Sequence, residues 1–516
     1  MIPRSRLPLP APSHAATGPA LPTRRRAAGR IVDAALGLGA AGLGLPAFAA
    51  EQADRAIAAV RQLVARGEIP QGATLRVRAK QGNMSSLLGR EHAMQREWER
   101  QTGTRIDASA MPHTDSLELI RAGQEVDLTV ARSHEYADLV HLGLIENLGP
   151  MLERLGFELP TDPARGYMLL ERQAVRDGQV VAIPADFDTT MLFLRRDLLE
   201  DPTERAAFRA RFGRELAAPR TWKEYDELVR WFHRPQEGFY GCCEARDPNT
   251  AWMYWMPRYI SGALPNQWLF DERMRPLIAS PAGIAATEHF LATVPCSPPG
   301  ILENGRDFTY TLPFLVRGKA FATILTLATA KIAQRDDSAV KGKLMATPIP
   351  GTLVGDRLVR RPTFIYGNNL VVPRSSPNKL LALLYALWVT DPENSLRSVT
   401  ANGIADPYRY HHLRDESVRA VYTPEAVDVL ERSLPDLAPS GTGLPGDSQY
   451  LSALNGALIE AASGRTSARE AMQRTARQWD LITDRIGRSA QMASWKGVRR
   501  LYPGMGTTGP SIASAR

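Results

Sequence analysis

The chain has 516 residues, of which 44% are hydrophobic and 23% are charged, a composition typical of soluble globular proteins with more than one domain. Its formal net charge is +8, but the first 50 residues hold six arginines and one aspartate, so most of the excess lies there. The weak positive charge of the remainder does not favour a nucleic acid partner.

Residues 1–50 have the pattern of an export signal. The basic run Arg24-Arg25-Arg26 precedes a Gly/Ala-rich apolar stretch that ends in Ala47-Phe48-Ala49, a cleavage pattern of the A-x-A type. The order Thr23-Arg24-Arg25 is similar to a twin-arginine signal. We predict export to the periplasm with cleavage near Ala49; an uncleaved anchoring helix is the alternative. No later stretch reaches ~18 uncharged apolar residues, so the mature chain is not expected to span a membrane.

Helix and strand patterns alternate in the next part of the chain. Residues 51–72 predict an amphipathic lead-in helix, and Leu75, Val77 and Ala79 mark one face of a half-buried strand. We then expect a polar turn at 81–83, strands near 104–107 and 126–131, and helices near 85–98, 116–122 and 136–142. This order predicts βαβ units and a parallel sheet, in which ligands bind at the carboxyl ends of the strands. The polar residues expected there are Gln81, Asn83, Ser133 and His134.

The stretch Val180–Leu199 predicts a hinge between two lobes. An apolar run, Val180 to Ile183, is stopped by Pro184, and a second apolar run follows from Met191 to Leu194. Asp186 and Asp188 lie in the polar bend between the two runs. A cleft between lobes is the usual place for a small ligand, so we predict that Asp188 binds the ligand.

The densest aromatic stretch follows a helix whose start has a capping box, Thr221 with Glu224. Its rings belong to Trp252, Tyr254, Trp255, Tyr259 and Trp268. Flat rings can cover the apolar faces of a sugar, but they can equally fill the core of the second lobe. We expect at least one of Trp252 and Trp255 to line the cleft.

Several motifs stand in a fixed order along the chain. They are Asp127-Leu128-Thr129-Val130, Gly143-Leu144-Ile145, the strand pattern over 314–324, Gly367-Asn368-Asn369 with Ser376-Pro377-Asn378-Lys379, Thr390-Asp391-Pro392-Glu393, and a late helix capped by Ser467 and Glu470. Together with Val180–Leu199 they resemble the bacterial extracellular solute-binding proteins of ABC importers, in the sugar-binding, maltose-binding protein-like class. That class often has a tryptophan after the 314–324 strand; here Leu325-Thr326 follows, which implies a different or smaller ligand and places Thr326 at the cleft.

This resemblance implies an α/β periplasmic-binding-protein fold with two lobes joined by a multi-strand hinge. We expect lobe I to comprise residues 73–187 and 365–410, lobe II residues 188–364 and 411–490, and residues 491–516 to form a loose tail. The implied function is that of a monomeric periplasmic component that captures a small carbohydrate or polyol by hinge closure and delivers it to ABC permease subunits. Neither a cofactor nor a metal is expected. The candidate ligand contacts are Asn83, His134, Asp188, Trp252, Trp255, Thr326, Asn368 and Tyr450.

Two other functions are alternatives to solute binding. An exported glycan hydrolase needs two carboxylates facing one bond, whereas Asp186 and Asp188 alternate on a strand, and neither G-x-S-x-G nor H-E-x-x-H occurs. A metal-chelate receptor needs clustered histidines or tyrosines; the cluster of Tyr408, Tyr410, His411 and His412 is interpreted as a surface loop. The cysteines leave two possibilities open: a disulfide from Cys296 to Cys242 or Cys243, or three free thiols.

Overall fold

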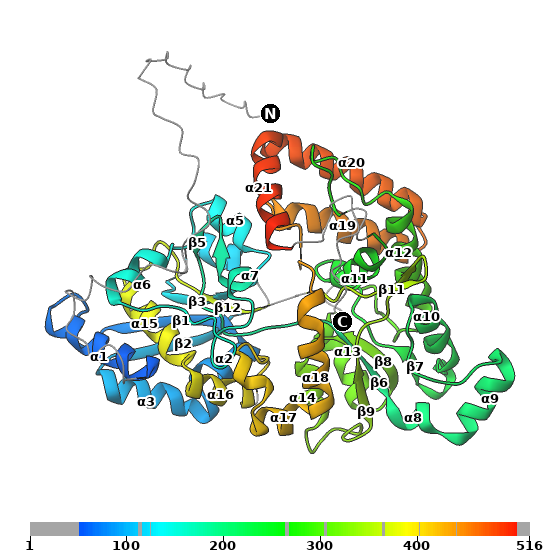
Figure 1. Cartoon of the computed structure of the whole chain (residues 1–516), viewed down its shortest axis with the longest axis horizontal. Coiled ribbons are helices and arrows are strands. Elements are labelled where there is room, and N and C mark those ends of the chain that lie inside the picture. Colours follow the sequence, from blue (N-terminus) through cyan, green and yellow to red (C-terminus); the bar gives the residue numbers. More distant parts are fainter. Residues whose placement is uncertain are drawn as a thin grey trace, which may run out of the picture. The chain divides into compact units, whose positions relative to one another are not determined.

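The computed structural model describes residues 51–111, 116–123, 125–263, 268–303, 307–363, 367–401, 403–439 and 441–502. The export signal predicted for residues 1–50 lies outside these ranges. Within them, two four-stranded sheets are surrounded by helices, as Figure 1 shows. No helix among the described residues combines the length and the apolar character needed to cross a membrane.

The first sheet has the strand order β12-β3-β1-β2. Strand β1 (Thr74–Lys80) pairs in parallel with β2 (Arg105–Met111) and with β3 (Leu128–Ala131), and β12 (Asn369–Val371) runs antiparallel to β3. Leu75, Val77 and Ala79 are buried, so the predicted alternation is confirmed. The chain before β6 forms the helices α1 (Gln52–Ala65), α2 (Gln81–Leu88), α3 (Ala93–Thr102), α4 (Ser116–Arg121), α5 (Tyr136–His141), α6 (Gly149–Leu155) and α7 (Leu170–Ala174), and α15 (Lys379–Val389) and α16 (Pro392–Thr400) follow β12.

The second sheet has the order β7-β8-β6-β9. Strand β6 (Met191–Arg195) is antiparallel to β8 (Ala320–Leu325) and to β9 (Leu344–Thr347), while β7 (Tyr240–Cys242) is parallel to β8. The chain between β6 and β12 forms the helices α8 (Arg196–Glu200), α9 (Pro202–Phe212), α10 (Trp222–Trp231), α11 (Ala251–Ala263), α12 (Pro281–Ala292), α13 (Phe308–Val316) and α14 (Ala328–Ala333), and the last part of the chain forms α17 (Glu416–Tyr422), α18 (Pro424–Ser433), α19 (Asp447–Ala462), α20 (Ala468–Ile486) and α21 (Arg488–Leu501). Two small ribbons, β4 (Val175–Arg176) with β5 (Gln179–Val180) and β10 (Thr352–Val354) with β11 (Arg357–Val359), complete the strands.

The predicted crossing segment connects the two lobes. Val181 and Ala182 belong to the core of the first lobe, and Leu192 and Leu194 belong to the core of the second. The apolar run 180–183 is not a continuous strand: β5 ends at Val180, and Ile183 forms an isolated bridge with Leu370. The chain therefore leaves one core and enters the other within ten residues, with its acidic bend between them.

Three local predictions are corrected or completed by the structure. The turn expected at 81–83 is wrong, because α2 begins at Gln81 directly after β1. The loose tail expected from residue 491 is wrong up to residue 502, because α21 buries Gln491, Trp495 and Val498 on one face. The rest of that tail lies outside the described residues. Both predicted capping boxes, at Thr221 and at Ser467, are present.

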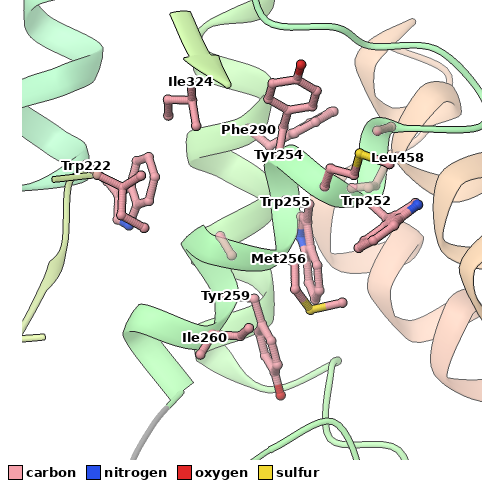
Figure 2. Packing of buried hydrophobic residues seen from close by; sticks show 14 of the residues in the cluster. Trp222, Trp252, Tyr254, Trp255, Met256, Tyr259, Ile260, Phe290, Ile324 and Leu458 are labelled. Carbon is pink, nitrogen blue, oxygen red and sulfur yellow. The ribbon is translucent and has the colours of Figure 1, made fainter. Parts of the chain in front are cut away.

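The core of the second lobe is built around α11. Trp255 stacks on Tyr259 with ring centroids 4.7 Å apart, and its indole nitrogen donates to Thr287 Oγ1 at 2.8 Å. Trp252 lies on another side of the same helix, beside Leu458 of α19, as Figure 2 shows. Because α11 is packed on several sides at once, nearly all of its side chains are buried.

A buried ionic cluster follows β7 in this core. Glu244 accepts hydrogen bonds from Arg246 Nη2 at 2.7 Å and from Arg258 Nη2 at 3.0 and 3.1 Å, and Tyr225 also donates to it. All of these side chains are buried. Burial alone would raise the pKa of Glu244, but the two guanidinium groups outweigh it and lower the pKa to about 2. The cluster thus holds the start of the loop at 247–250, which reaches the cleft described below.

We predict that Glu244→Gln destabilises the protein by ~3–5 kcal/mol at pH 7, because two buried arginines lose their counter-charge. Urea unfolding measures the change. The control is Asp336→Asn, which removes an exposed carboxylate paired with Lys341 and should leave the midpoint unchanged. The wild type should lose the Glu244 contribution as the pH falls from the ordinary pKa of 4.5 toward 2, and the variant should show no such loss. Equal midpoints for wild type and Glu244→Gln would contradict this account.

Candidate functional site

A cavity of about 340 Å³ is lined by residues from both lobes. Its apolar wall consists of Phe308, Leu312, Leu325, Ala328, Ile332 and Ile404. Its polar side chains are Lys80, Gln81, Arg132, Asp188, Thr309, Thr326, Thr329 and Asn368. Apolar walls with a few converging polar groups are the usual composition of a small-molecule site.

The ends of strands place these polar groups. Lys80 and Gln81 lie at the carboxyl end of β1, Thr326 directly follows β8, and Asn368 directly precedes β12. Gly82 allows the close approach of Ile404, because a Cβ atom at residue 82 would lie 2.8 Å from the Ile404 side chain. The cavity is therefore built from the sheet edges that meet the crossing segment.

Strand β12 holds the crossing segment through backbone and side-chain hydrogen bonds. Ile183 and Leu370 exchange two backbone hydrogen bonds of 2.9 Å. The amide of Asn369 accepts from Ala185 N at 3.1 Å and donates to Tyr136 Oη at 3.0 Å and to the carbonyl of Gln173 at 3.2 Å. Asn369 is fully buried, so these bonds have no competition from water.

Asp186 ties a third segment to this crossing. Its carboxylate accepts from Asn368 Nδ2 at 2.7 Å, from Asn368 N at 3.3 Å and from the backbone N–H of Asp406 at 2.7 Å. Asp406 lies in the loop after α16 and accepts from Ala328 N at 3.0 Å, at the start of α14 in the second lobe. Two crossings of the chain are thus joined at one buried point.

Three carboxyl groups gather at this point. The oxygens of Asp186, Asp188 and Asp406 all lie within 4.8 Å of one another, and all three side chains are buried. Burial raises the pKa of Asp186 to about 6 and that of Asp406 to about 7. The pKa of Asp188 is raised well above its ordinary value, first by burial and then by repulsion from the other two carboxylates. Asp188 is the member of this cluster that also lines the cavity.

The spacing of the three carboxyl groups would suit a cation, and a lysine ammonium faces them. Lys331 is buried in α14, and its Nζ donates to the carbonyls of Val399 at 3.0 Å and Ala405 at 3.1 Å. Burial lowers the pKa of Lys331 to about 8, against the attraction of Asp406 and Asp186, which raises it. Lys331 therefore supplies the positive charge that the cluster requires.

A second cavity of about 520 Å³ adjoins the first. The two share Arg132, Phe308 and Thr309 as lining residues, so they are neighbours, and we call the pair the cleft. The second cavity adds His134 and Trp252, whose rings contact edge to face with centroids 5.4 Å apart. Its remaining lining is largely polar, with carboxylates at Glu118, Glu135, Asp138, Asp247, Asp307 and Asp447.

The structure brings five of the eight predicted ligand contacts to this cleft. Asp188, Thr326 and Asn368 line the first cavity, and His134 and Trp252 line the second. The other three lie elsewhere. Asn83 is buried in α2, one residue beyond the cavity wall; Trp255 and Tyr450 are fully buried in the core of the second lobe, where Tyr450 Oη bonds Thr483 Oγ1 at 2.8 Å.

The histidine cluster expected on a surface loop is buried, so that interpretation is wrong. His412 and Tyr408 have no exposed surface, and His411 is about half-buried. His412 Nδ1 accepts from Tyr408 N at 3.3 Å, and its Nε2 lies 2.8 Å from Ser395 Oγ. Burial lowers the pKa of His412 well below its ordinary value. Both ring nitrogens are thus engaged in holding the loop that carries Asp406.

Several residues in and around the site were not predicted. Arg132 precedes the polar pair that was expected at the end of β3, and Phe308 begins α13 after residues with no clear pattern. Asp406 and Lys331 reach the crossing segment from parts of the chain far from it in sequence. Of the two possibilities left open for the cysteines, the structure shows three free thiols: Cys242, Cys243 and Cys296 are all buried and unpaired.

Comparison with known proteins gives one family and many similar folds. The family model described as "bacterial extracellular solute-binding protein" matches residues 93–409. No curated protein matches the sequence. Among solved structures, a solute-binding protein of an ABC transporter from Agrobacterium radiobacter K84 in complex with ribitol has a TM-score of 0.66 at 17% identity, covering 80% of this chain and 100% of its own.

Two further structures have similar scores. Maltose-bound MalE3 of T. maritima has a TM-score of 0.65 at 19% identity, covering 80% of this chain and 100% of its own. A solute-binding protein from Agrobacterium vitis S4 with bound D-mannitol has a TM-score of 0.62 at 17% identity, covering 80% of this chain and 99% of its own. These likenesses confirm the predicted two-lobed α/β fold of periplasmic binding proteins.

We predict that Asn369→Ala lowers the free energy of unfolding by ~2–3 kcal/mol, because it leaves Ala185 N and the Gln173 carbonyl buried without partners. Urea unfolding measures the loss. The matched control is Asn249→Ala, an exposed amide at the rim of the second cavity, which should leave stability unchanged. Equal losses in the two variants would show that Asn369 does not hold the crossing segment.

Proposed function

This chain belongs to the family of bacterial extracellular solute-binding proteins, and on that premise we propose that it captures a small carbohydrate or polyol in the cleft around Asp188. The observation that carries the proposal is the buried carboxyl group of Asp188 at a cavity shared by two lobes. A buried carboxylate accepts hydrogen bonds from hydroxyl groups, which a sugar or polyol supplies in series.

The other lining groups suit such a solute. Asn368 donates one amide hydrogen to Asp186, which leaves its amide oxygen available to a ligand, and Thr326 is hydrogen-bonded to Asp188. The side chains of Asn368 and Thr326 are therefore already held in position before a ligand binds. Thr329 Oγ1 is buried with no hydrogen-bond partner among the described residues. Phe308, Leu325 and Ile332 offer apolar area to the C–H faces of the solute.

The cellular setting follows from the same proposal. An N-terminal export signal would direct the chain to the periplasm, where it would act as a monomer. Closure of the two lobes on the solute would create the surface that the transmembrane subunits of an ABC importer read. We propose binding and release without turnover. In support, Asp186 is occupied by three backbone or amide N–H donors and does not line the cavity, so it cannot pair with Asp188 across a substrate bond.

A thermal-shift screen over ribitol, D-mannitol, tagatose and maltose tests the proposal. A ligand at 100-fold its Kd stabilises the protein by ~2.7 kcal/mol. We expect Asp188→Ala to abolish the shift without lowering the melting point of the empty protein, because the raised pKa of Asp188 costs the folded empty protein stability at pH values above the ordinary pKa of aspartate. The control Asp336→Ala, at an exposed site, should shift as the wild type does. A shift in Asp188→Ala equal to that of the wild type would remove Asp188 from the site.

The adjoining cavity predicts a dependence on solute length. Ser452 is exposed on α19 and lines the second cavity but not the first. Ser452→Trp should fill that cavity, weakening maltose at least ~10-fold by steric exclusion while changing D-mannitol affinity little. Calorimetric titration of both ligands measures the difference. If the variant binds both as the wild type does, the second cavity takes no part in binding.

A further inference from the structure

The contact between Asp188 and Asp406 needs a hydrogen that neither ionised group has. Their carboxyl groups are within hydrogen-bonding reach of each other. Asp406 Oδ2 accepts from Ala328 N at 3.0 Å, whereas its Oδ1 is buried without a backbone donor among the described residues, and the Tyr422 hydroxyl lies beside the same carboxyl group. A carboxylate only accepts hydrogen bonds, so a bond between two of them requires that one be protonated.

The charges around Asp188 and Asp406 also favour a proton on one of the two carboxyl groups. Asp186 faces the pair from the crossing segment, Lys331 from α14 and Tyr422 from α17, where its hydroxyl donates to the carbonyl of Val399 at 2.9 Å. Tyr408 and Arg335 lie farther out, beside Asp186 and Lys331 respectively. Three carboxylates and one ammonium leave two uncompensated negative charges in a buried volume, and a proton removes one of them. Burial raises the pKa of all three acids, as such a proton requires.

We propose that Asp188 and Asp406 share one proton in the empty cleft, and that a hydroxyl group of the bound solute replaces this proton, so that capture releases it to solvent. The inference rests on the proposed function of the cleft. In the exchange, the solute O–H donates to Asp188, which becomes a full carboxylate, and the displaced proton passes to buffer. No covalent bond of the solute forms or breaks.

The exchange assigns different roles to the two acids. Asp188 lines the cavity and contacts the solute. Asp406 does not line the cavity and acts as a positioning residue, holding the proton until the solute arrives. The site therefore selects neutral solutes with a donating hydroxyl group, because an anionic group would meet the cluster after its proton has left.

Isothermal titration of D-mannitol, or of the screened solute with the largest thermal shift, tests the exchange between pH 5.5 and 8.5. The Kd should fall up to ~10-fold per pH unit below about pH 7 and level off above it, since one proton leaves. Titrations in phosphate and in Bis-Tris, which both buffer near pH 6 and differ in ionisation enthalpy, should both report about one released proton at that pH. A flat profile, or a Kd that rises with pH, would overturn the proposal.

Asp406→Asn separates this exchange from a structural role. The asparagine oxygen can still accept from Ala328 N, and its amide can donate to Asp188 without a proton to lose. Its Kd should vary less than ~3-fold over the same pH range, and proton release should disappear. Asp336→Asn, the exposed control, should retain the profile of the wild type. Retention of full pH dependence in Asp406→Asn would contradict the shared proton.

Infrared spectra of the empty protein labelled with 13C-aspartate test the proton without any ligand. At pH 6.5 the band of protonated carboxylic acid should be stronger in the wild type and in Asp336→Asn than in Asp406→Asn, where only other buried acids such as Asp447, whose pKa burial raises to about 7, still contribute. Bands of equal strength in the wild type and Asp406→Asn would overturn the inference, as would stabilisation of the empty protein by calcium or magnesium that requires Asp406. If no solute in the panel binds, the proposed function and the exchange both fail, while the infrared band still reports on the acid pair.

Discussion

The cleft depends on the way β12 holds the crossing segment at residues 183–186. Two backbone hydrogen bonds to Leu370 and one amide, Asn369, fix the chain at the point where it leaves the first core. One residue later, Asp186 connects the same point to the loop that carries Asp406. These buried hydrogen bonds hold the segment in one conformation, because any other conformation would leave buried donors unpaired at a cost in free energy. The rigid segment then delivers Asp188 to the cavity.

The same arrangement explains why the cleft is both apolar and acidic. Low dielectric surroundings strengthen every charge interaction, so a single ammonium at Lys331 acts on three carboxyl groups at once. Aliphatic and aromatic walls keep water from screening the cluster, while the side of Asp188 that meets the cavity stays available to a solute. The carboxyl group of Asp188 thus takes part both in binding the solute and in the charge balance of the buried cluster. The ionic cluster of Glu244 depends on the same strengthening of charge interactions, but its one carboxylate is shared by two guanidinium groups inside the core, and none of the three side chains lines the cleft.

Much of the architecture could be predicted because its signals are local. The alternation of Leu75, Val77 and Ala79 identifies a strand, and the pairs Thr221/Glu224 and Ser467/Glu470 identify helix starts. Asp188 could be predicted because it lies in the bend between two apolar runs, and Thr326 because it follows a strand whose pattern resembles that of the family. Asp406 could not be, since 220 positions separate it from Asp186, and no pattern in a single sequence reports such a contact.

Other errors have equally specific causes. Trp252 and Trp255 are three positions apart on one helix that is covered on several sides, so periodicity alone could not say which ring reaches the cleft. Composition misled at the end of the chain, where glycine and serine suggested a tail although Gln491, Trp495 and Val498 have helical spacing. The cluster that contains His411 and His412 was predicted to lie on a surface loop because histidine is a polar residue. The loop that carries them is instead packed inward around Ser395.

The three cysteines carry a consequence for biogenesis. Each sulfur is buried as a thiol, and burial raises the pKa of Cys296 to about 11 and that of Cys243 to about 12, so few thiolates are present to react. The fold therefore does not depend on a disulfide, and it would form equally well in a reducing compartment, before the export proposed above.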